Sequence, residues 1–176
     1  MKRHPARGFM LIEVLIAVLV LAFGLLALAR AMATSTLDEV ESFQRSQAMV
    51  IAQEMVERIN ANRKEALSYV GSYGAPSTIQ DCTLQATVLL RDQCEFGNRL
   101  MGSGTREAGN AMGSAIAARA CITESAPGSN AYVVAIAWQG LKSTDAPDSA
   151  CGEQEFDREE NRRVFSTVLR IATLGT

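Results

Sequence analysis

Histidine is nearly absent from this sequence of 176 residues, and its absence limits the chemistry that the chain can perform. The single histidine is His4, so the rest of the chain has no imidazole for general acid or base catalysis. The sequence also lacks the His-Glu-x-x-His, Gly-x-Ser-x-Gly and P-loop patterns. Because no catalytic constellation is present, we expect no catalytic residues and no enzymatic activity.

The sequence also has no large excess of positive or negative charge. The formal net charge is −2, whereas a general nucleic-acid binder needs a cationic surface. Hydrophobic residues make up 48% of the chain, which argues against intrinsic disorder. We therefore expect a folded protein with no nucleic-acid partner.

Recognisable metal-ligand patterns are also absent. The four cysteines include no Cys-x-x-Cys pair and no histidine lies near them, so zinc is not expected. Residues 145–160 are rich in acids that could hold calcium, but their spacing matches no calcium loop, and we expect a solvated loop. The sequence predicts no metal, no cofactor and no small-molecule substrate.

The sequence does contain one long apolar run near its N-terminus. The 21 residues from Phe9 to Ala29 carry a single charge, Glu13. As a helix they would span roughly 32 Å, which matches the hydrocarbon core of a membrane. Residues 1–8 contain no acid and are basic, so they would stay in the cytoplasm. The leader charges are Lys2, Arg3 and Arg7.

A cleaved secretory signal and a plain signal anchor are two ordinary explanations of such a run. A secretory signal has an apolar region of about 7 to 15 residues, which is shorter than this one. An anchor fits the length but leaves Glu13 unexplained, because an ionised carboxylate at the centre of a membrane helix costs about 2.5 to 3.5 kcal/mol. Glu13 is near the start of the run, which reduces that cost.

Neither proline nor glycine occurs after Leu25 until Gly71. Apolar or small residues recur in this stretch at spacings of mostly three, four or seven, which predicts an amphipathic helix that ends before Gly71. We expect a membrane-spanning helix over residues 9–30, its amphipathic continuation over 31–70 and a globular head over 71–176. The main role expected of the apolar stripe is to pack on this head. The stripe comprises Leu37, Val40, Ala48, Ile51, Met55, Ile59 and Ala66.

The remaining residues predict a small α+β domain. Residues 87–101 have helical periodicity, and Gly102 follows them. Residues 118–124, 132–139 and 163–173 are rich in strand-forming residues, and the connections between them suggest an antiparallel meander. We expect this sheet to lie against the amphipathic half of the long helix.

The four cysteines of this domain indicate disulfides if the domain is exported, because small exported domains with an even number of cysteines usually form them. Four cysteines allow three connectivities. Local closure is the simplest and favours Cys82–Cys94 and Cys121–Cys151, while the other two pairings stay open.

The run Gly8-Phe9-Met10-Leu11-Ile12-Glu13-Val14 resembles the processing site of type IV prepilins and type II secretion pseudopilins. The resemblance implies a type IV pilin-like fold, with cleavage between Gly8 and Phe9 by a prepilin peptidase and N-methylation of Phe9. It also gives Glu13 the role of the acid needed for assembly, where it would face the N-terminal amine of a neighbouring subunit. Many pilins carry a proline midway through the membrane half, where their helix melts in the assembled filament. This sequence has only Gly24 there, so the resemblance does not predict such melting for this chain.

Further features resemble the PilV family of minor type IV pilins. They are Arg45-Ser46-Gln47-Ala48 and Ala61-Asn62-Arg63 in the stem, a helix near residues 91–101, a cysteine-bearing strand, and Ala137-Trp138-Gln139 in the next strand. The resemblance implies a structural subunit that helps prime pilus assembly and enters the filament at or near the tip. Twitching motility and adhesion follow by the same implication.

The resemblance also implies a location and a set of partners. The chain would cross the inner membrane once, keep its head in the periplasm, and later reach the pilus at the cell surface. Its partners would be the prepilin peptidase, other minor pilins, the major pilin and the inner-membrane assembly platform. Two alternatives stay open: a minor pseudopilin of a type II secretion system, and a membrane-anchored periplasmic binding or enzymatic domain.

Overall fold

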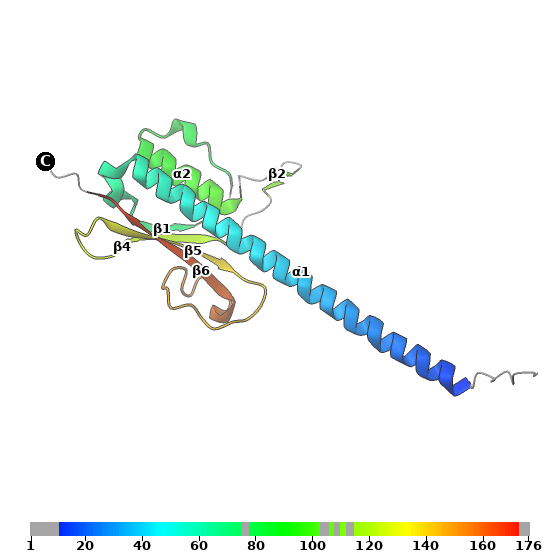
Figure 1. Ribbon diagram of the computed structural model, residues 1–176. Helices are drawn as coiled ribbons and strands as arrows, with labels where there is room; N and C mark the ends of the chain where they lie inside the picture. Colours follow the sequence, from blue (N-terminus) through cyan, green and yellow to red (C-terminus); the bar gives the residue numbers. More distant parts are fainter. Residues whose placement is uncertain (1–10, 75–77, 103–105, 108–109, 112–114, 173–176) are drawn as a thin grey trace, which may run out of the picture. The chain divides into compact units, whose positions relative to one another are not determined.

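The computed structural model describes residues 11–74, 78–102, 106–107, 110–111 and 115–172. The chain divides into two compact units, residues 1–40 and residues 41–176. Figure 1 shows that one long helix runs through both units and that the second unit holds all the other elements. We call the described residues 11–40 the stem segment and the described residues from 41 onward the head unit.

Helix α1 spans Leu11–Ala61. It contains no proline and one glycine, Gly24, so its sequence has no residue that must break it. Its buried side chains all lie in the head unit; they are Gln44, Ala48, Ile51, Ala52, Met55 and Ile59. The prediction that an apolar helix continues as an amphipathic one is confirmed, while its expected start at residues 9–10 lies outside the described part.

The α-helix ends at Ala61, earlier than the predicted Val70. Arg63–Tyr69 instead forms η1, a stretch of 3₁₀ turns that follows Asn62, whose φ is −110° and ψ 40°. With three residues per turn, Ala66 and Tyr69 fall on one side of η1, and both are buried. The predicted α-helix is wrong over this segment because the tighter winding allows both side chains to enter the core.

The head unit contains a four-stranded antiparallel sheet with the order β1-β4-β5-β6. Its strands are β1 Gly71–Gly74, β4 Arg119–Glu124, β5 Ala131–Gln139 and β6 Arg162–Arg170. The last three are the predicted meander, each found within one to three residues of its expected bounds. Strand β1 was not predicted, because its sequence Gly-Ser-Tyr-Gly lacks apolar alternation and reads as a helix breaker.

Short elements complete the head unit. Helix α2 spans Val88–Met101, as predicted. Thr87 caps its N-terminus by accepting a hydrogen bond from the backbone N of Leu90 at 3.2 Å, and Gly102 ends it with a left-handed φ of 94°. The 3₁₀ turns η2 and η3 and the two-residue strands β2 and β3 were not predicted. They span Cys82–Leu84, Glu159–Asn161, Arg106–Glu107 and Asn110–Ala111.

One face of α1 forms the main core together with α2 and the sheet. Met55 and Ile59 are completely buried and belong to one cluster with Phe96 of α2 and with Ile122 and Ile136 of the sheet. Figure 1 shows the C-terminal part of α1 and α2 running side by side over the sheet. The predicted packing of the stripe is confirmed from Ala48 to Ala66, whereas Leu37 and Val40 are exposed.

The opposite face of the sheet has a smaller core. Successive strand residues point to opposite faces, so Ala135 and Ala137 of β5 face away from neighbours such as Ile136. They form a second cluster with Cys151 of the long β5–β6 loop, against which Phe156 and Val164 pack. The loop therefore covers apolar surface that would otherwise face water.

The α1 face should dominate the stability of the head unit. We expect Met55→Ala to lower the free energy of unfolding by about 2 to 5 kcal/mol, because it leaves a cavity in a fully enclosed site. The measurement is urea unfolding of the full chain in detergent, followed by the fluorescence of Trp138, the only tryptophan. Val50→Ala on the same helix is the control, since Val50 is 54% exposed and should change stability little.

Candidate functional site

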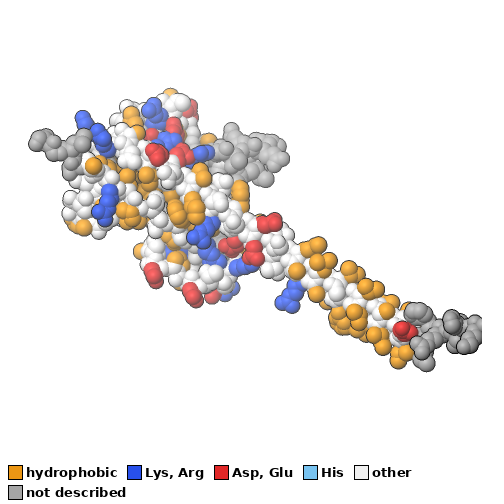
Figure 2. All heavy atoms as spheres, viewed as in Figure 1, with side chains coloured by type: hydrophobic (Ala, Val, Ile, Leu, Met, Phe, Trp, Pro, Cys, Tyr) orange, Lys and Arg blue, Asp and Glu red, His pale blue; other side chains and the backbone are white. Residues whose placement is uncertain are grey.

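The stem segment has an apolar surface on every side. Each of its described residues is exposed, and between Leu11 and Ala29 the only charged residue is Glu13. Figure 2 shows hydrophobic side chains gathered along this segment. The large apolar side chains exposed before Val40 are Leu11, Ile12, Val14, Leu15, Ile16, Val18, Leu19, Val20, Leu21, Phe23, Leu25, Leu26, Leu28, Met32 and Leu37.

A helix that is hydrophobic all round needs lipid or protein to cover it. Helix α1 is long and apolar enough to cross a membrane, and it is the one such helix in the described part of the chain. Glu13 lies within this surface on the first turn of the described helix. An ionised carboxylate at this position is costly wherever the segment is covered, unless a positive charge lies near it.

The other predicted processing residues fall outside the described residues. These are the cleavage pair Gly8 and Phe9 and the leader charges Lys2, Arg3 and Arg7. Their assignment continues to rest on the sequence.

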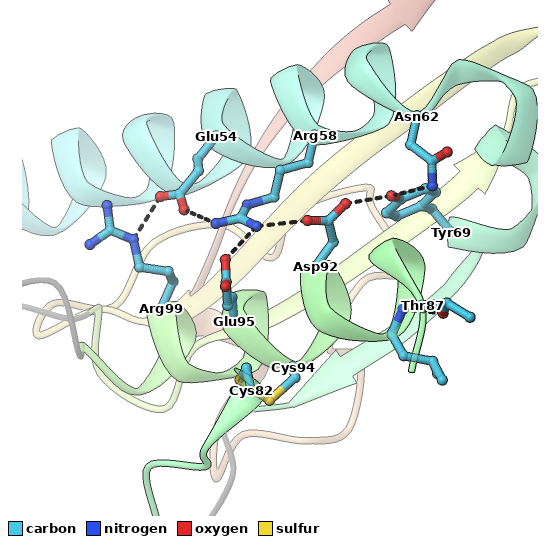
Figure 3. A network of polar contacts seen from close by, with 11 residues as sticks. Glu54, Arg58, Asn62, Tyr69, Cys82, Thr87, Asp92, Cys94, Glu95 and Arg99 are labelled. Carbon is cyan, nitrogen blue, oxygen red and sulfur yellow. Dashed lines mark hydrogen bonds and ion pairs between the residues drawn. A yellow bond between two sulfur atoms is a disulfide. The ribbon is translucent and has the colours of Figure 1, made fainter. Parts of the chain in front are cut away.

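In the head unit, α1 and α2 are joined by a network of charged side chains (Figure 3). Arg58 of α1 is at its centre and lies 2.9 Å from Glu54, 2.9 Å from Asp92 and 2.7 Å from Glu95. Arg99 of α2 closes the network from the other side, with Nε 2.6 Å from Glu54. Burial alone would lower the pKa of Arg58, but the hydrogen bonds to the three carboxylates outweigh it and raise that pKa.

The network extends to η1 through two uncharged side chains. The Tyr69 hydroxyl donates a hydrogen bond of 2.6 Å to Asp92, and the Asn62 amide donates one of 3.1 Å to the same hydroxyl. Burial and the hydrogen bond to Asp92 raise the pKa of Tyr69 to about 12. A carboxylate of α2 is thus shared by the end of α1 and by η1, which fixes these three elements together (Figure 3).

A second polar contact joins the start of the head unit to the sheet. Glu41 of α1 accepts hydrogen bonds from the backbone N of Leu141 at 2.6 Å and of Lys142 at 3.0 Å. Its other oxygen lies 3.5 Å from Nε of Arg163 on β6. A Cβ at Gly140 would lie 2.9 Å from the Arg163 guanidinium carbon, so a larger residue there would make the Arg163 side chain shift.

Disulfides and buried polar groups hold the loops. Cys82 is joined to Cys94 and Cys121 to Cys151, the two pairings that local closure favours. Buried Asn98 accepts from the backbone N of Gln80 at 2.9 Å and donates to its carbonyl at 2.8 Å, which pins the segment before Cys82 onto α2.

The acidic stretch takes part in local contacts. Glu159 accepts hydrogen bonds from the backbone N of Gln154 and from Arg162, and these lower its pKa. Arg162 is almost completely buried and also donates to the carbonyls of Ser149 and Cys151. Within the described residues, no three His, Cys, Asp or Glu side chains are grouped so that they could hold a metal ion.

The sequence analysis missed the network around Arg58, although a signal for it exists. Glu54 and Arg58 are four residues apart on α1, a spacing at which opposite charges pair. Asp92, Glu95 and Arg99 repeat at three and four residues on α2, so they share one helix face. The acid and the arginine on α1 could thus pair with the arginine and the acids on α2, which favours contact between these two faces.

Comparison with known proteins gave one match. A family described as Tt1218-like, Type IV pilin Tt1218, matches residues 29–97. These residues run from α1 through η1, β1 and η2 into α2. No curated protein and no solved structure matched the chain.

The fold and this match lead to the same class of protein. A long N-terminal helix that packs on a small antiparallel sheet is the arrangement of a type IV pilin. The chain is therefore similar to type IV pilins in its arrangement and, over residues 29–97, in its sequence. Type IV pilins are structural subunits that associate with membranes and with other pilins.

Removing the cation at the centre of the network should destabilise the head unit. We expect Arg58→Met to lower the free energy of unfolding by about 1.5 to 3 kcal/mol, since the buried carboxylate of Asp92 loses a charged hydrogen-bond donor. Arg45→Met is the matched control on the same helix, because no ion pair in the described part involves the exposed Arg45. Equal urea midpoints for the two variants would contradict the role given to Arg58.

The raised pKa of Tyr69 should make the head unit less stable at high pH. The unfolded phenol ionises near pH 10 while the folded one keeps its proton to about 12, so the stabilisation is complete below pH 10 and is lost between these values. We expect Tyr69→Phe to weaken the fall in unfolding free energy over this range. Phenolate absorbance should show one fewer late-ionising tyrosine in the variant; an unchanged titration would exclude this explanation.

Proposed function

We propose that this protein is a minor type IV pilin, similar to the PilV family, whose stem segment is held first in the inner membrane and then in the filament. The observation that supports this most directly is the continuous exposed apolar surface from Leu11 to Ala29, interrupted only by Glu13. A soluble domain has no use for such a surface, whereas a subunit that leaves a membrane for a helical core needs it in both places.

Cleavage between Gly8 and Phe9 by a prepilin peptidase would create the charge that Glu13 needs. The new amine on Phe9 is cationic, and N-methylation preserves its charge. In a filament, Glu13 of one subunit pairs with the amine of a neighbour, so neither charge is left alone in an apolar core. The acid that an anchor leaves unexplained is in this way part of the assembly mechanism.

The direction of the chain follows from the leader. The basic residues 1–8 stay in the cytoplasm, so the head unit lies in the periplasm until assembly moves it to the cell surface. Both disulfides suit an oxidising compartment of this kind.

The role as a minor subunit is the finer part of the proposal. Resemblance to PilV supports a place among the minor pilins that prime assembly, at or near the tip, with twitching motility and adhesion as consequences. The partners are the prepilin peptidase, the other pilins and the inner-membrane assembly platform. A minor pseudopilin of type II secretion is the alternative that shares leader and stem.

Replacing Glu13 tests the mechanism. We expect Glu13→Leu to be processed, so that mass spectrometry finds methylated Phe9 at the N-terminus, but to be at least about tenfold depleted from sheared filaments, since losing about 1.4 kcal/mol lowers an equilibrium tenfold. Glu39→Leu is the matched control, an exposed acid of the same helix outside the apolar run, and should enter filaments normally.

Three results would oppose the proposal. An intact Met1 would indicate an uncleaved anchor, and an N-terminus just after the apolar run would indicate a cleaved secretory signal. Normal piliation with Glu13→Leu would remove the role given to the acid. Recovery of the parent chain with secretion components instead of pili would favour the pseudopilin alternative.

A further inference from the structure

A pocket of about 370 Å³ opens in the head unit beside the first residues of its helical part. Helix α1 supplies one wall, and strands β5 and β6 supply the other. Its lining comprises Glu41, Ser42 and Arg45 of α1 with Trp138, Arg163 and Val164 of the sheet.

The charges in this pocket are unevenly compensated. Glu41 and Arg163 neutralise each other, and the oxygens of Glu41 also accept from the backbone N of Leu141 and Lys142. Arg45 follows Glu41 by four residues, a spacing at which opposite charges often pair. Glu41 is nevertheless engaged elsewhere, and no ion pair or hydrogen bond joins the exposed Arg45 side chain to the described part of the chain. One positive charge is therefore left over in the pocket.

Trp138, which lies in the opposite wall, has a hydrogen-bond donor without an acceptor in the described part of the chain. Trp138 is 3% exposed, and its indole Nε1 donor is buried without a hydrogen-bond partner among the described residues. A buried donor in this state costs about 1 to 3 kcal/mol. Because the Nε1 atom is closed to solvent, an entering oxygen acceptor could reach it only if the neighbouring side chains shifted.

An exposed apolar side chain lies beside Arg45 on the surface of α1. Met49 is 38% exposed. Met49 follows Arg45 by four residues, so the two side chains are neighbours on the helix surface. A cation next to an exposed apolar side chain is typical of the margin of a protein interface.

From these observations we infer that the pocket receives an aspartate or glutamate side chain of a neighbouring pilin subunit, and that its carboxylate pairs with Arg45. The inference rests on the proposed function, which buries the preceding stem segment among other subunits. A guanidinium can hold a carboxylate through two parallel hydrogen bonds, and the Ser42 hydroxyl supplies a further donor.

Such a contact would determine which subunit can lie next to this chain more than it would increase the affinity between subunits. Charged contacts at an interface mainly suppress wrong partners and fix register, while apolar burial supplies most of the driving force. Arg45 is thus a specificity residue, and a subunit that lacks an acid at the facing position would be disfavoured.

Photo-crosslinking identifies what occupies the pocket. The full chain carries benzoylphenylalanine at position 45, or at position 91 as the control, in cells that assemble pili. Arg91 is exposed on α2 and, like Arg45, forms no ion pair with the described residues. We expect position 45 to crosslink to another pilin and position 91 not to do so. A product with lipid, or with a protein that is not a pilin, overturns the inference.

Charge reversal tests the chemistry of the contact. We expect Arg45→Glu to reduce incorporation into sheared filaments at least about tenfold, Arg45→Lys to retain most of it, and Arg91→Glu to leave it unchanged, because only like charges that face each other repel strongly. The amount of chain in the membrane and its urea midpoint should be the same for all, since no ion pair or hydrogen bond joins Arg45 to the described residues of the head unit.

The outcomes separate this inference from the proposed function. If the parent chain enters filaments and Arg45→Glu enters equally well, the inference is wrong and the proposed function stands. If the parent chain itself is absent from filaments, both are wrong.

Discussion

The packing of one α1 face against the sheet is the interaction on which the head unit depends. Residues 48 to 59 of α1 enter a core that also contains α2 and the inner side of β4 and β5. Without this helix, the sheet would expose a wide apolar face to water. The same helix has no buried residue before Gln44, so one continuous element serves a packed core at one end and an exposed apolar surface at the other.

The polar contacts of the head unit orient elements that apolar packing alone would leave less defined. Apolar burial is non-directional, whereas an arginine that contacts carboxylates on two helices permits few arrangements. The network around Arg58 sets α2 and η1 against the end of α1, and Glu41 sets the β5–β6 loop and β6 against its beginning. The net stabilisation from ion pairs that are partly removed from water is small, because the cost of desolvating both charges offsets their attraction.

The sequence allowed most of the elements to be predicted, for identifiable reasons. Helix α2 and strands β4, β5 and β6 have clear periodicity and clear breakers, and each was found close to its expected bounds. Strand β1 could not be foreseen because it exists through pairing with β4, a contact about fifty residues away along the chain. The end of α1 was misplaced because local periodicity does not distinguish an α-helix from 3₁₀ turns that bury Ala66 and Tyr69.

In the candidate site too, features that depend on local sequence were predicted, and features that depend on distant contacts were not. Glu13 stood out because it contradicts its apolar surroundings, and a contradiction within a local pattern is visible in sequence. The pocket beside Arg45 could not be foreseen, because its walls come from α1 and from strands about a hundred residues later. The pocket is distinguished by Arg45, whose side chain has no ion-pair partner among the described residues. The sequence cannot reveal this, because it does not show which side chains surround Arg45.

The bond between Cys121 and Cys151 has a topological consequence. Cys121 lies in β4, Cys151 lies in the loop after β5, and the whole of β5 is contained between them. The disulfide therefore closes a covalent ring around the central hairpin of the sheet, and β6 lies outside that ring. If β6 separated from the sheet, the disulfide would still link β4 covalently to the loop that follows β5.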